Sequence, residues 1–155
     1  MIIISACLCG INCKYNGGNN LRKDIKDLFD QGKAVLVCPE NLGELPTPRS
    51  AREIVGGTGK DVLEGRARVI SAEGKDSTKE FLEGAEKTLE IAKKVGAKVA
   101  ILKAKSPSCG CGWIYDGTFS GKLIKGNGVT AELLSKKGIK VYNEDNFKEE
   151  EWGEL

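Results

Sequence analysis

Four short apolar runs, rich in Ile, Val and Leu, are spaced along the chain. They cover residues 2–6, 34–37, 99–102 and 138–142. Short apolar runs bounded by turn residues are typical of strands in a buried sheet. The pattern therefore predicts four strands, separated by longer segments of mixed polarity.

Between these runs, apolar positions follow the 3.6-residue period of amphipathic helices. Asn20 is suited to cap a first helix that ends before Gly32. The segment Ser77–Glu80 has the capping-box pattern and opens a long helix over residues 77–94. A third helix is predicted over residues 128–137, so strands and helices alternate along most of the chain.

This alternation predicts an α/β fold, in which a mostly parallel, Rossmann-like sheet is flanked by helices. The length of 155 residues fits a single domain, residues 1–155. Residues 41–75 interrupt the alternation, because prolines and several glycines there predict an irregular excursion. Within it, a hairpin is expected over residues 61–70.

Three cysteines lie in the segments that follow three of the predicted strands. Cys7 follows the first strand, Cys38 the second and Cys109 the third. In open α/β sheets, ligands bind beyond the carboxyl ends of the strands. The fold prediction therefore brings these three thiols to one edge of the sheet.

The overall composition narrows the class of protein. With 40% hydrophobic and 30% charged residues, the chain is typical of a soluble globular protein. No apolar run approaches the roughly 18 residues of a membrane span, and the N-terminal run is too short for a signal peptide. We therefore expect a cytoplasmic protein with reduced thiols. A net charge of +2 without a basic stripe gives no support for general nucleic-acid binding, but it leaves a small anionic substrate open.

The chain has six cysteines and no histidine. Without histidine, the usual general base, Ser-His and Cys-His nucleophile pairs and His-containing zinc sites are all excluded. Any metal must be held mainly by thiolate or carboxylate groups. The pairs Cys7/Cys9 and Cys109/Cys111 have one intervening residue and lack the C-x-x-C spacing of zinc ribbons.

Two alternatives to a shared cluster remain at this point. Four of the six thiols could hold a structural zinc ion, or the cysteines could be unrelated buried residues that pack as small apolar side chains. However, the cysteines stand in or beside segments rich in Gly, Pro and Ser. This placement favours a shared metal or iron–sulfur site over unrelated thiols.

Several unusual motifs resemble those of the thiouracil desulfidase family. They occur in the family's order and over nearly the full length: Ser5–Gly10, Cys13–Gly17, Val37–Glu40, Leu45–Arg49, Lys105–Gly110, Ile114–Phe119 and Gly126–Thr130. The resemblance implies a [4Fe–4S] cluster that is held by only three cysteines, so that one iron stays open for the sulfur of a thiocarbonyl substrate. It also implies non-redox desulfuration of 2- or 4-thiouracil-type compounds, including 4-thiouridine monophosphate, to the uracil form and sulfide.

The family pattern assigns roles to individual cysteines. Cys38 and Cys109 match motif cysteines, whereas the first loop offers Cys7 and Cys13, of which we favour Cys7 as the third ligand. Cys9 and Cys111 stand where the family usually has other residues, which makes them doubtful protein ligands. One of these two thiols could still cap the fourth iron in a resting state.

Residues near the motif cysteines are expected to catalyse the reaction. Glu40 matches a proton-transfer role, and a carboxylate beside a desolvated metal site is a plausible base in a chain without histidine. Ser106 matches a position that bonds the substrate or the water, with Ser108 beside it. The simpler alternative is that Glu40 is a helix cap or a surface carboxylate, and that both hydroxyls only satisfy loop backbone groups.

A nucleotide substrate would also need groups that bind its phosphate and its base. Arg49 and the segment Gly126–Asn127–Gly128, which precedes a predicted helix N-terminus, are the candidates for the phosphate. Tyr15, Tyr115 and Phe119 could stack on the base, although core packing would equally explain an aromatic residue. The expected partner is thus a small thiolated pyrimidine or its nucleotide. The competing functions are an iron–sulfur sulfide carrier without hydrolytic turnover and a structural zinc protein.

Overall fold

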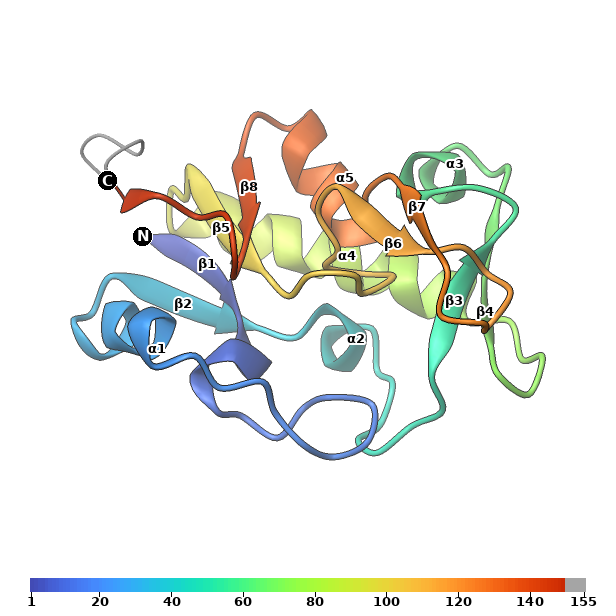
Figure 1. The fold of residues 1–155 in the computed structure, drawn as a ribbon. Helices are drawn as coiled ribbons and strands as arrows, with labels where there is room; N and C mark the ends of the chain where they lie inside the picture. The colour runs from blue at the N-terminus through green and yellow to red at the C-terminus, as the bar shows by residue number, and fades with distance from the viewer. Residues whose placement is uncertain (150–155) are drawn as a thin grey trace.

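A four-stranded parallel sheet lies at the centre of the computed structural model, which describes residues 1–149 (Figure 1). The strands are β1 (Ile2–Ser5), β2 (Ala34–Val37), β5 (Val99–Leu102) and β8 (Lys140–Asn143), and their order across the sheet is β2-β1-β5-β8. All three neighbouring pairs are parallel. The predicted α/β class and the four predicted strands are therefore confirmed.

The two faces of the sheet are covered by different helices. Ile2 and Ile4 of β1 pack in a cluster with α1 (Lys23–Asp30), whereas Ile3 packs on the other side with α4 (Thr78–Lys94) and α5 (Val129–Lys136). In Figure 1, α4 runs behind the sheet and α1 lies in front of β2. Because all three isoleucines are fully buried, each contributes about 1.5–3 kcal/mol of burial free energy.

The first helix begins later than predicted, whereas the long helix begins as predicted, with Ser77 as its N-cap residue but without the expected side-chain capping bond. The backbone N–H of Asn20 donates to the Cys7 carbonyl, so α1 begins only after Arg22. The Ser77 side chain makes no capping bond and instead accepts a hydrogen bond from Arg52 Nε, 2.8 Å away. The carboxylate of Asp76 accepts the first-turn N–H of α4.

The excursion over residues 41–75 contains more regular structure than predicted. It holds β3 (Arg52–Val55), α3 (Gly59–Leu63) and β4 (Arg68–Ser71), preceded by the short helix α2 (Pro39–Leu42). β4 pairs antiparallel with β3, so the hairpin expected over residues 61–70 is wrong. A capping box between Thr58 and Asp61 makes the first part of that segment helical.

A second hairpin, which was not predicted, follows the third cysteine loop. It joins β6 (Trp113–Tyr115) to β7 (Leu123–Lys125). The sequence carries a recognisable signal for it, because Asp116-Gly117 lies between segments rich in aromatic and β-branched residues. This hairpin lies beside β3, whose Glu53 accepts a backbone hydrogen bond from Gly117.

Helix α2 rests on α4 through two glycines. A Cβ atom on Gly84 would lie 2.0 Å from the Pro39 carbonyl oxygen, and one on Gly43 would lie 2.0 Å from the Glu80 carbonyl oxygen. No side chain fits between these backbones. The position of α2, which begins directly after Cys38, is therefore fixed by the longest helix of the fold.

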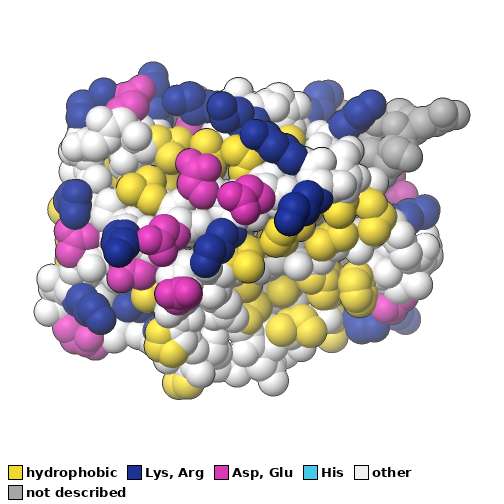
Figure 2. Space-filling view, turned by 180° about the vertical axis from the view of Figure 1, so that it is seen from behind, with side chains coloured by type: hydrophobic (Ala, Val, Ile, Leu, Met, Phe, Trp, Pro, Cys, Tyr) yellow, Lys and Arg dark blue, Asp and Glu magenta, His cyan; other side chains and the backbone are white. Residues whose placement is uncertain are grey.

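The surface carries charges of both signs. Figure 2 shows the molecule from behind, where Lys and Arg side chains lie among Asp and Glu, with a broad area of apolar side chains beside them. Within residues 1–149, no helix is long and apolar enough to cross a membrane.

Candidate functional site

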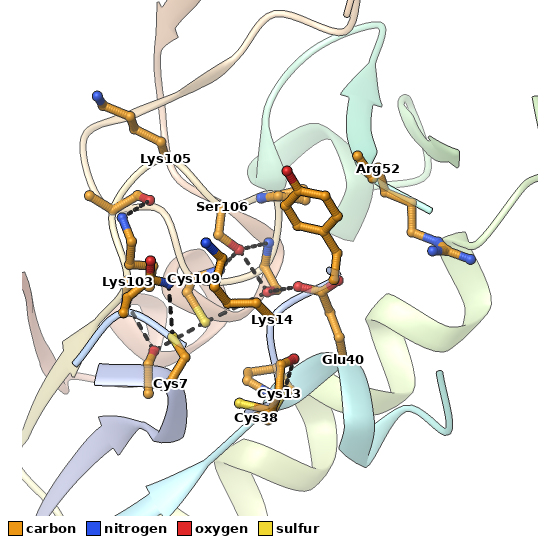
Figure 3. Close-up of a pocket in the computed structure, with 18 of the residues that line it drawn as sticks. Cys7, Cys13, Lys14, Cys38, Glu40, Arg52, Lys103, Lys105, Ser106 and Cys109 are labelled. Atoms are coloured by element: carbon orange, nitrogen blue, oxygen red, sulfur yellow. Dashed lines mark hydrogen bonds between the residues drawn. The ribbon is translucent and has the colours of Figure 1, made fainter. Parts of the chain in front are cut away.

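A cavity of about 590 Å³ opens beyond the carboxyl ends of β1, β2 and β5. Four thiols line it, those of Cys7, Cys13, Cys38 and Cys109. Figure 3 shows their sulfur atoms in one region, supplied by segments that are distant in the sequence. The three strand-end cysteines thus converge as predicted, and Cys13 joins them.

Cys7 and Cys109 are each held by polar side chains. Cys7 lies in the 3₁₀ turn η1 (Ala6–Cys9), and the Asn20 side-chain nitrogen donates to its sulfur at 3.6 Å. The hydroxyls of Ser5 and Ser108 donate to the Cys109 sulfur at 3.4 and 3.6 Å. Donors that face a sulfur stabilise its thiolate, which is the form that binds metals. Sequence reasoning missed Ser5 and treated Asn20 only as a helix cap.

The thiol of Cys13 lies between those of Cys7 and Cys38. Hydrogen bonds with Cys38 and Cys7 raise the pKa of Cys13. The same bonds lower the pKa of Cys7, and they lower that of Cys38 to about 7. Cys13 therefore keeps its proton and favours thiolates at its two neighbours.

The pKa of Cys109, in contrast to those of Cys7 and Cys38, is raised. Burial raises the pKa of its thiol to about 12, against the two hydroxyl donors, and the nearby charges of Cys7 and Cys38 raise it further. These three residues are thus close enough to interact electrostatically. A bound metal would favour the thiolate form of Cys109 instead, because a coordinating thiol is deprotonated outright.

Cys9 and Cys111 do not line the cavity. Cys9 is buried, which raises the pKa of its thiol to about 11. The Cys111 sulfur donates to the Val141 carbonyl at 3.4 Å and lies at a separate surface hollow. Both thiols thus face surroundings other than the thiol-lined cavity.

The four thiols lie around the cavity and do not meet at a single point. Among residues 1–149, no three His, Cys, Asp or Glu side chains are grouped closely enough to hold a single metal ion. All six cysteines are free thiols. Four free thiols thus line one cavity, and this donor set fits an iron–sulfur cluster, which is held by cysteine thiolates.

Glu40, Ser108 and Ser106 form a hydrogen-bonded chain at this cavity. Ser108 Oγ donates to Glu40 Oε2 at 3.2 Å, and the two serine oxygens are 3.0 Å apart. Ser106 Oγ also accepts the backbone N–H groups of Ser108 and Cys109, each at 3.1 Å. All three residues line the cavity, as predicted for catalytic groups.

The direction of this chain follows from the number of lone pairs. A hydroxyl oxygen has two, and both of those on Ser106 accept backbone N–H groups. Its proton must therefore be donated, either to Ser108 Oγ or to a molecule in the cavity. Ser108 has a single hydroxyl proton, for which the acceptor-only carboxylate of Glu40 and the Cys109 sulfur compete.

Arg49 was predicted to bind a substrate phosphate, but protein groups already occupy its donors. Nε donates to Glu40 Oε1 at 3.1 Å, and Nη2 donates to the Cys13 carbonyl at 2.9 Å. Nη1 donates to Pro46, Thr47 and Asn41. With its side chain only 3% exposed, Arg49 links the first two cysteine loops and orients Glu40.

The segment Gly126–Asn127–Gly128 was also expected to bind phosphate, but the structure does not bring it to the cavity. The backbone N–H groups at the start of α5 donate to the carbonyls of Pro107 and Ser108. Asn127 Oδ1 accepts the N–H of Gly112. These groups hold the third cysteine loop in place, so the expected anion site is not formed.

Other cations and aromatic rings surround the thiols. Tyr15 lines the cavity as predicted and is 47% exposed. Lys103 forms an ion pair with the buried Glu144 at 2.8 Å, a contact that sequence reasoning missed. Figure 3 shows Arg52 and Lys105 extending away from the sulfur atoms.

Comparison with known proteins agrees with this geometry. Residues 2–146 match the profile of the 2-thiouracil desulfurase family. The chain belongs to this family. The chain is also 52% identical over 149 residues to the uncharacterized protein YbbK of Bacillus subtilis strain 168, with 96% of this chain and 99% of that protein covered.

A solved structure resembles this family member along nearly the whole chain. It is the [4Fe-4S]-dependent thiouracil desulfidase TudS, with a TM-score of 0.82 and 40% sequence identity. The match covers 93% of this chain and 90% of the TudS chain. The family resemblance and the α/β fold predicted from the sequence are thus confirmed.

Proposed function

We propose that this family member is a [4Fe–4S]-dependent enzyme that removes sulfur from thiouracil-type compounds without a redox step. Its substrates are 2- or 4-thiouracil or 4-thiouridine monophosphate, and its products are the corresponding uracil form and sulfide. The observation that carries this proposal is the cavity itself. It combines four cysteine thiols with a Glu40–Ser108–Ser106 hydrogen-bonded chain.

Cys7, Cys38 and Cys109 are the proposed ligands of the cluster. Each follows a neighbouring strand of one sheet, whereas Cys13 lies further along the first loop. When bound, the cluster supplies an iron without a protein ligand, which acts as a Lewis acid toward the substrate's sulfur. The cavity volume of about 590 Å³ lies within the usual range of small-molecule sites.

Side chains of the cavity accept and donate the protons of the reaction. Hydrolysis converts C=S and water into C=O and hydrogen sulfide, so a water molecule must lose its protons while the sulfur gains them. Glu40 accepts a proton from the attacking water as a general base, with Arg49 and Ser108 holding its two oxygens. Glu40 then returns that proton to the leaving sulfur, while Ser106, whose hydroxyl proton can be donated into the cavity, hydrogen-bonds the substrate or the water.

A nucleotide substrate would place its phosphate at the rim of the cavity. Lys14 and Lys105 line this cavity, and neither forms an ion pair with the other described residues. Arg49 is buried and has most of its donors bonded to protein groups. These two lysines therefore replace Arg49 as our candidates for the phosphate of 4-thiouridine monophosphate.

Anaerobic reconstitution followed by a desulfuration assay tests this proposal. We expect iron and sulfide to bind, the thiouracil absorbance to disappear, and one sulfide to be released for each uracil formed. Glu40→Gln should keep the iron and lose at least about 100-fold in kcat, the usual contribution of a general base. Glu44→Gln changes an exposed carboxylate of the next turn and should leave kcat unchanged.

Three outcomes would overturn the proposal. The first is a fully loaded cluster without turnover on any thiouracil, thiouridine or its phosphate. The second is one equivalent of zinc and no iron in anaerobically purified protein. The third is transfer of labelled sulfide to an acceptor protein without substrate hydrolysis, which would identify a sulfide carrier.

A further inference from the structure

One wall of the cavity is built from a part of the fold that carries no cysteine. It consists of β3 and the loop of the β6–β7 hairpin, which contribute Glu53, Tyr115 and Phe119 to the lining. The thiols and the Glu40 chain come from the loops of the parallel sheet. This wall therefore contributes none of the cavity thiols and none of the residues of the Glu40 chain.

Glu53 is a buried carboxylate that serves the hairpin loop. It is 9% exposed, and its Oε1 accepts the backbone N–H groups of Gly117 at 2.9 Å and Phe119 at 3.2 Å. It forms no ion pair with the described residues. A buried carboxylate is costly unless it is hydrogen-bonded, so these two bonds tie the loop firmly to β3.

The loop needs this anchor because two of its residues adopt left-handed backbone angles. Gly117 has φ +91°, and a Cβ there would lie 2.5 Å from the Ile54 carbonyl oxygen. Phe119 has φ +55°, which is unfavourable for a bulky residue. The Asp116 carboxylate fixes the turn between them by accepting the N–H and hydroxyl of Thr118, at 2.9 and 2.6 Å.

This strain does not serve core packing, because the Phe119 side chain stays 39% exposed at the cavity. A strained residue that the surroundings hold in place, with an aromatic ring presented to a cavity, is typical of a ligand contact. A pyrimidine ring has two flat apolar faces that thiolates, carboxylate and hydroxyls do not complement. The hairpin loop supplies the missing flat surface.

We propose that Phe119 is a specificity-determining residue that contacts the face of the pyrimidine ring, and that Glu53 is a positioning residue that holds it there. This inference rests on the proposed function, since it takes a thiouracil-type ring as the ligand. Phe119 thus contributes to binding of the ring and not to breakage of the C–S bond. Its removal should therefore affect affinity rather than kcat.

The test uses the cluster-loaded protein under anaerobic conditions, with 2-thiouracil as substrate and uracil as a non-reacting ring ligand. Phe119→Leu should raise both KM and the calorimetric Kd for uracil by roughly 2–12-fold, the size of one aromatic contact. Iron content and kcat should stay within about twofold. Phe119→Tyr keeps the ring and should keep the wild-type affinity.

Variants at two other residues distinguish the effect of the loop conformation from that of the Phe119 ring. Trp113→Leu removes another exposed aromatic side chain of the same hairpin, which lies at the separate hollow, and should change neither KM nor Kd. Glu53→Ala should weaken uracil binding as Phe119→Leu does and speed hydrogen exchange of the Gly117 and Phe119 amides. Glu53→Gln keeps an acceptor oxygen and should restore most of both properties.

The inference is overturned if Phe119→Leu leaves KM and the uracil Kd unchanged, or if it lowers kcat or iron content at an unchanged Kd. It is also overturned if the Glu53 variants bind uracil like wild type. Failure of the proposed function is a separate result. In that case the loaded wild type does not release sulfide from thiouracil, while the uracil Kd still reports on Phe119.

Discussion

Replacing Arg49 by Met tests whether the buried guanidinium holds the first two cysteine loops together. Arg49→Met keeps an unbranched apolar stem but removes all the donors of the side chain. Glu40 would lose its cationic partner, and the Cys13 carbonyl would lose a hydrogen bond of 2.9 Å. Both partners lie in a region where water cannot fully replace the lost contacts, because the Arg49 side chain is 3% and that of Glu40 16% exposed.

The expected destabilisation is large. Breaking a buried ion pair by removing one partner costs about 3–5 kcal/mol, because the other charge stays buried and unpaired. The matched control is Arg66→Met, since Arg66 is 58% exposed on its side chain and pairs with Asp61 at the surface. Exposed pairs contribute about 0–1 kcal/mol, so the same substitution should be nearly neutral there.

Urea unfolding of the reduced, metal-free protein measures this difference, with circular dichroism as the signal. At a slope near 2 kcal/mol/M, the Arg49→Met midpoint should fall by about 1.5–2.5 M relative to wild type. The slope itself should stay constant if both states keep their compactness. If Arg49→Met and Arg66→Met lie within about 1 kcal/mol of each other, the contacts of Arg49 do not stabilise the fold and this reasoning is refuted.

Three other predictions concern the helix contact, pH and the ligands. Gly84→Ala should destabilise the protein by about 1–3 kcal/mol and lower its iron content, because the added methyl group displaces α2. Glu86→Ala on the exposed face of α4 is the control. Equal iron content in the two variants would contradict this prediction. Hydrogen bonds from Thr78 lower the pKa of Asp76 below 3.8, so its stabilisation is present above that pH and lost as pH falls through the folded-state pKa. The difference in unfolding free energy between wild type and Asp76→Asn should therefore shrink on acidification, and a constant difference would argue against the bond. Cys7→Ala should lose iron and Cys13→Ala should retain it, whereas the reverse result would make Cys13 the third ligand.

The strands and the convergence of the thiols could be predicted because both depend on local signals. Apolar runs such as Val99–Leu102 can only be buried, and a parallel sheet gathers whatever follows its strands at one edge. The β6–β7 hairpin had a usable signal in Asp116-Gly117 that was not recognised. In these cases the residues themselves carry the structural information.

The errors have a common physical origin. Asn20, Ser77 and Arg49 each have several partners that would satisfy them, and the sequence nearby does not choose between these partners. In the folded protein, Asn20 hydrogen-bonds to a thiol, Ser77 to Arg52 and Arg49 to Glu40, and all three contacts are tertiary. The same holds for the start of α5, whose N–H groups bind a neighbouring loop instead of an anion. The partners of such polar groups therefore cannot be predicted from the nearby sequence.

The strand order has a consequence for how the protein is made. β5 carries the third loop and pairs with β1, so Cys109 joins the first two thiols only after most of the chain has been synthesised. Synthesis of the 71 residues from Pro39 to Cys109 takes roughly 4–14 s at a translation rate of about 5–20 residues per second. During that interval the nascent chain offers two of the three proposed ligand loops, with β1 still lacking β5 beside it. Capture of a cluster by all three loops is therefore a step that follows translation of the third loop and insertion of β5 into the sheet.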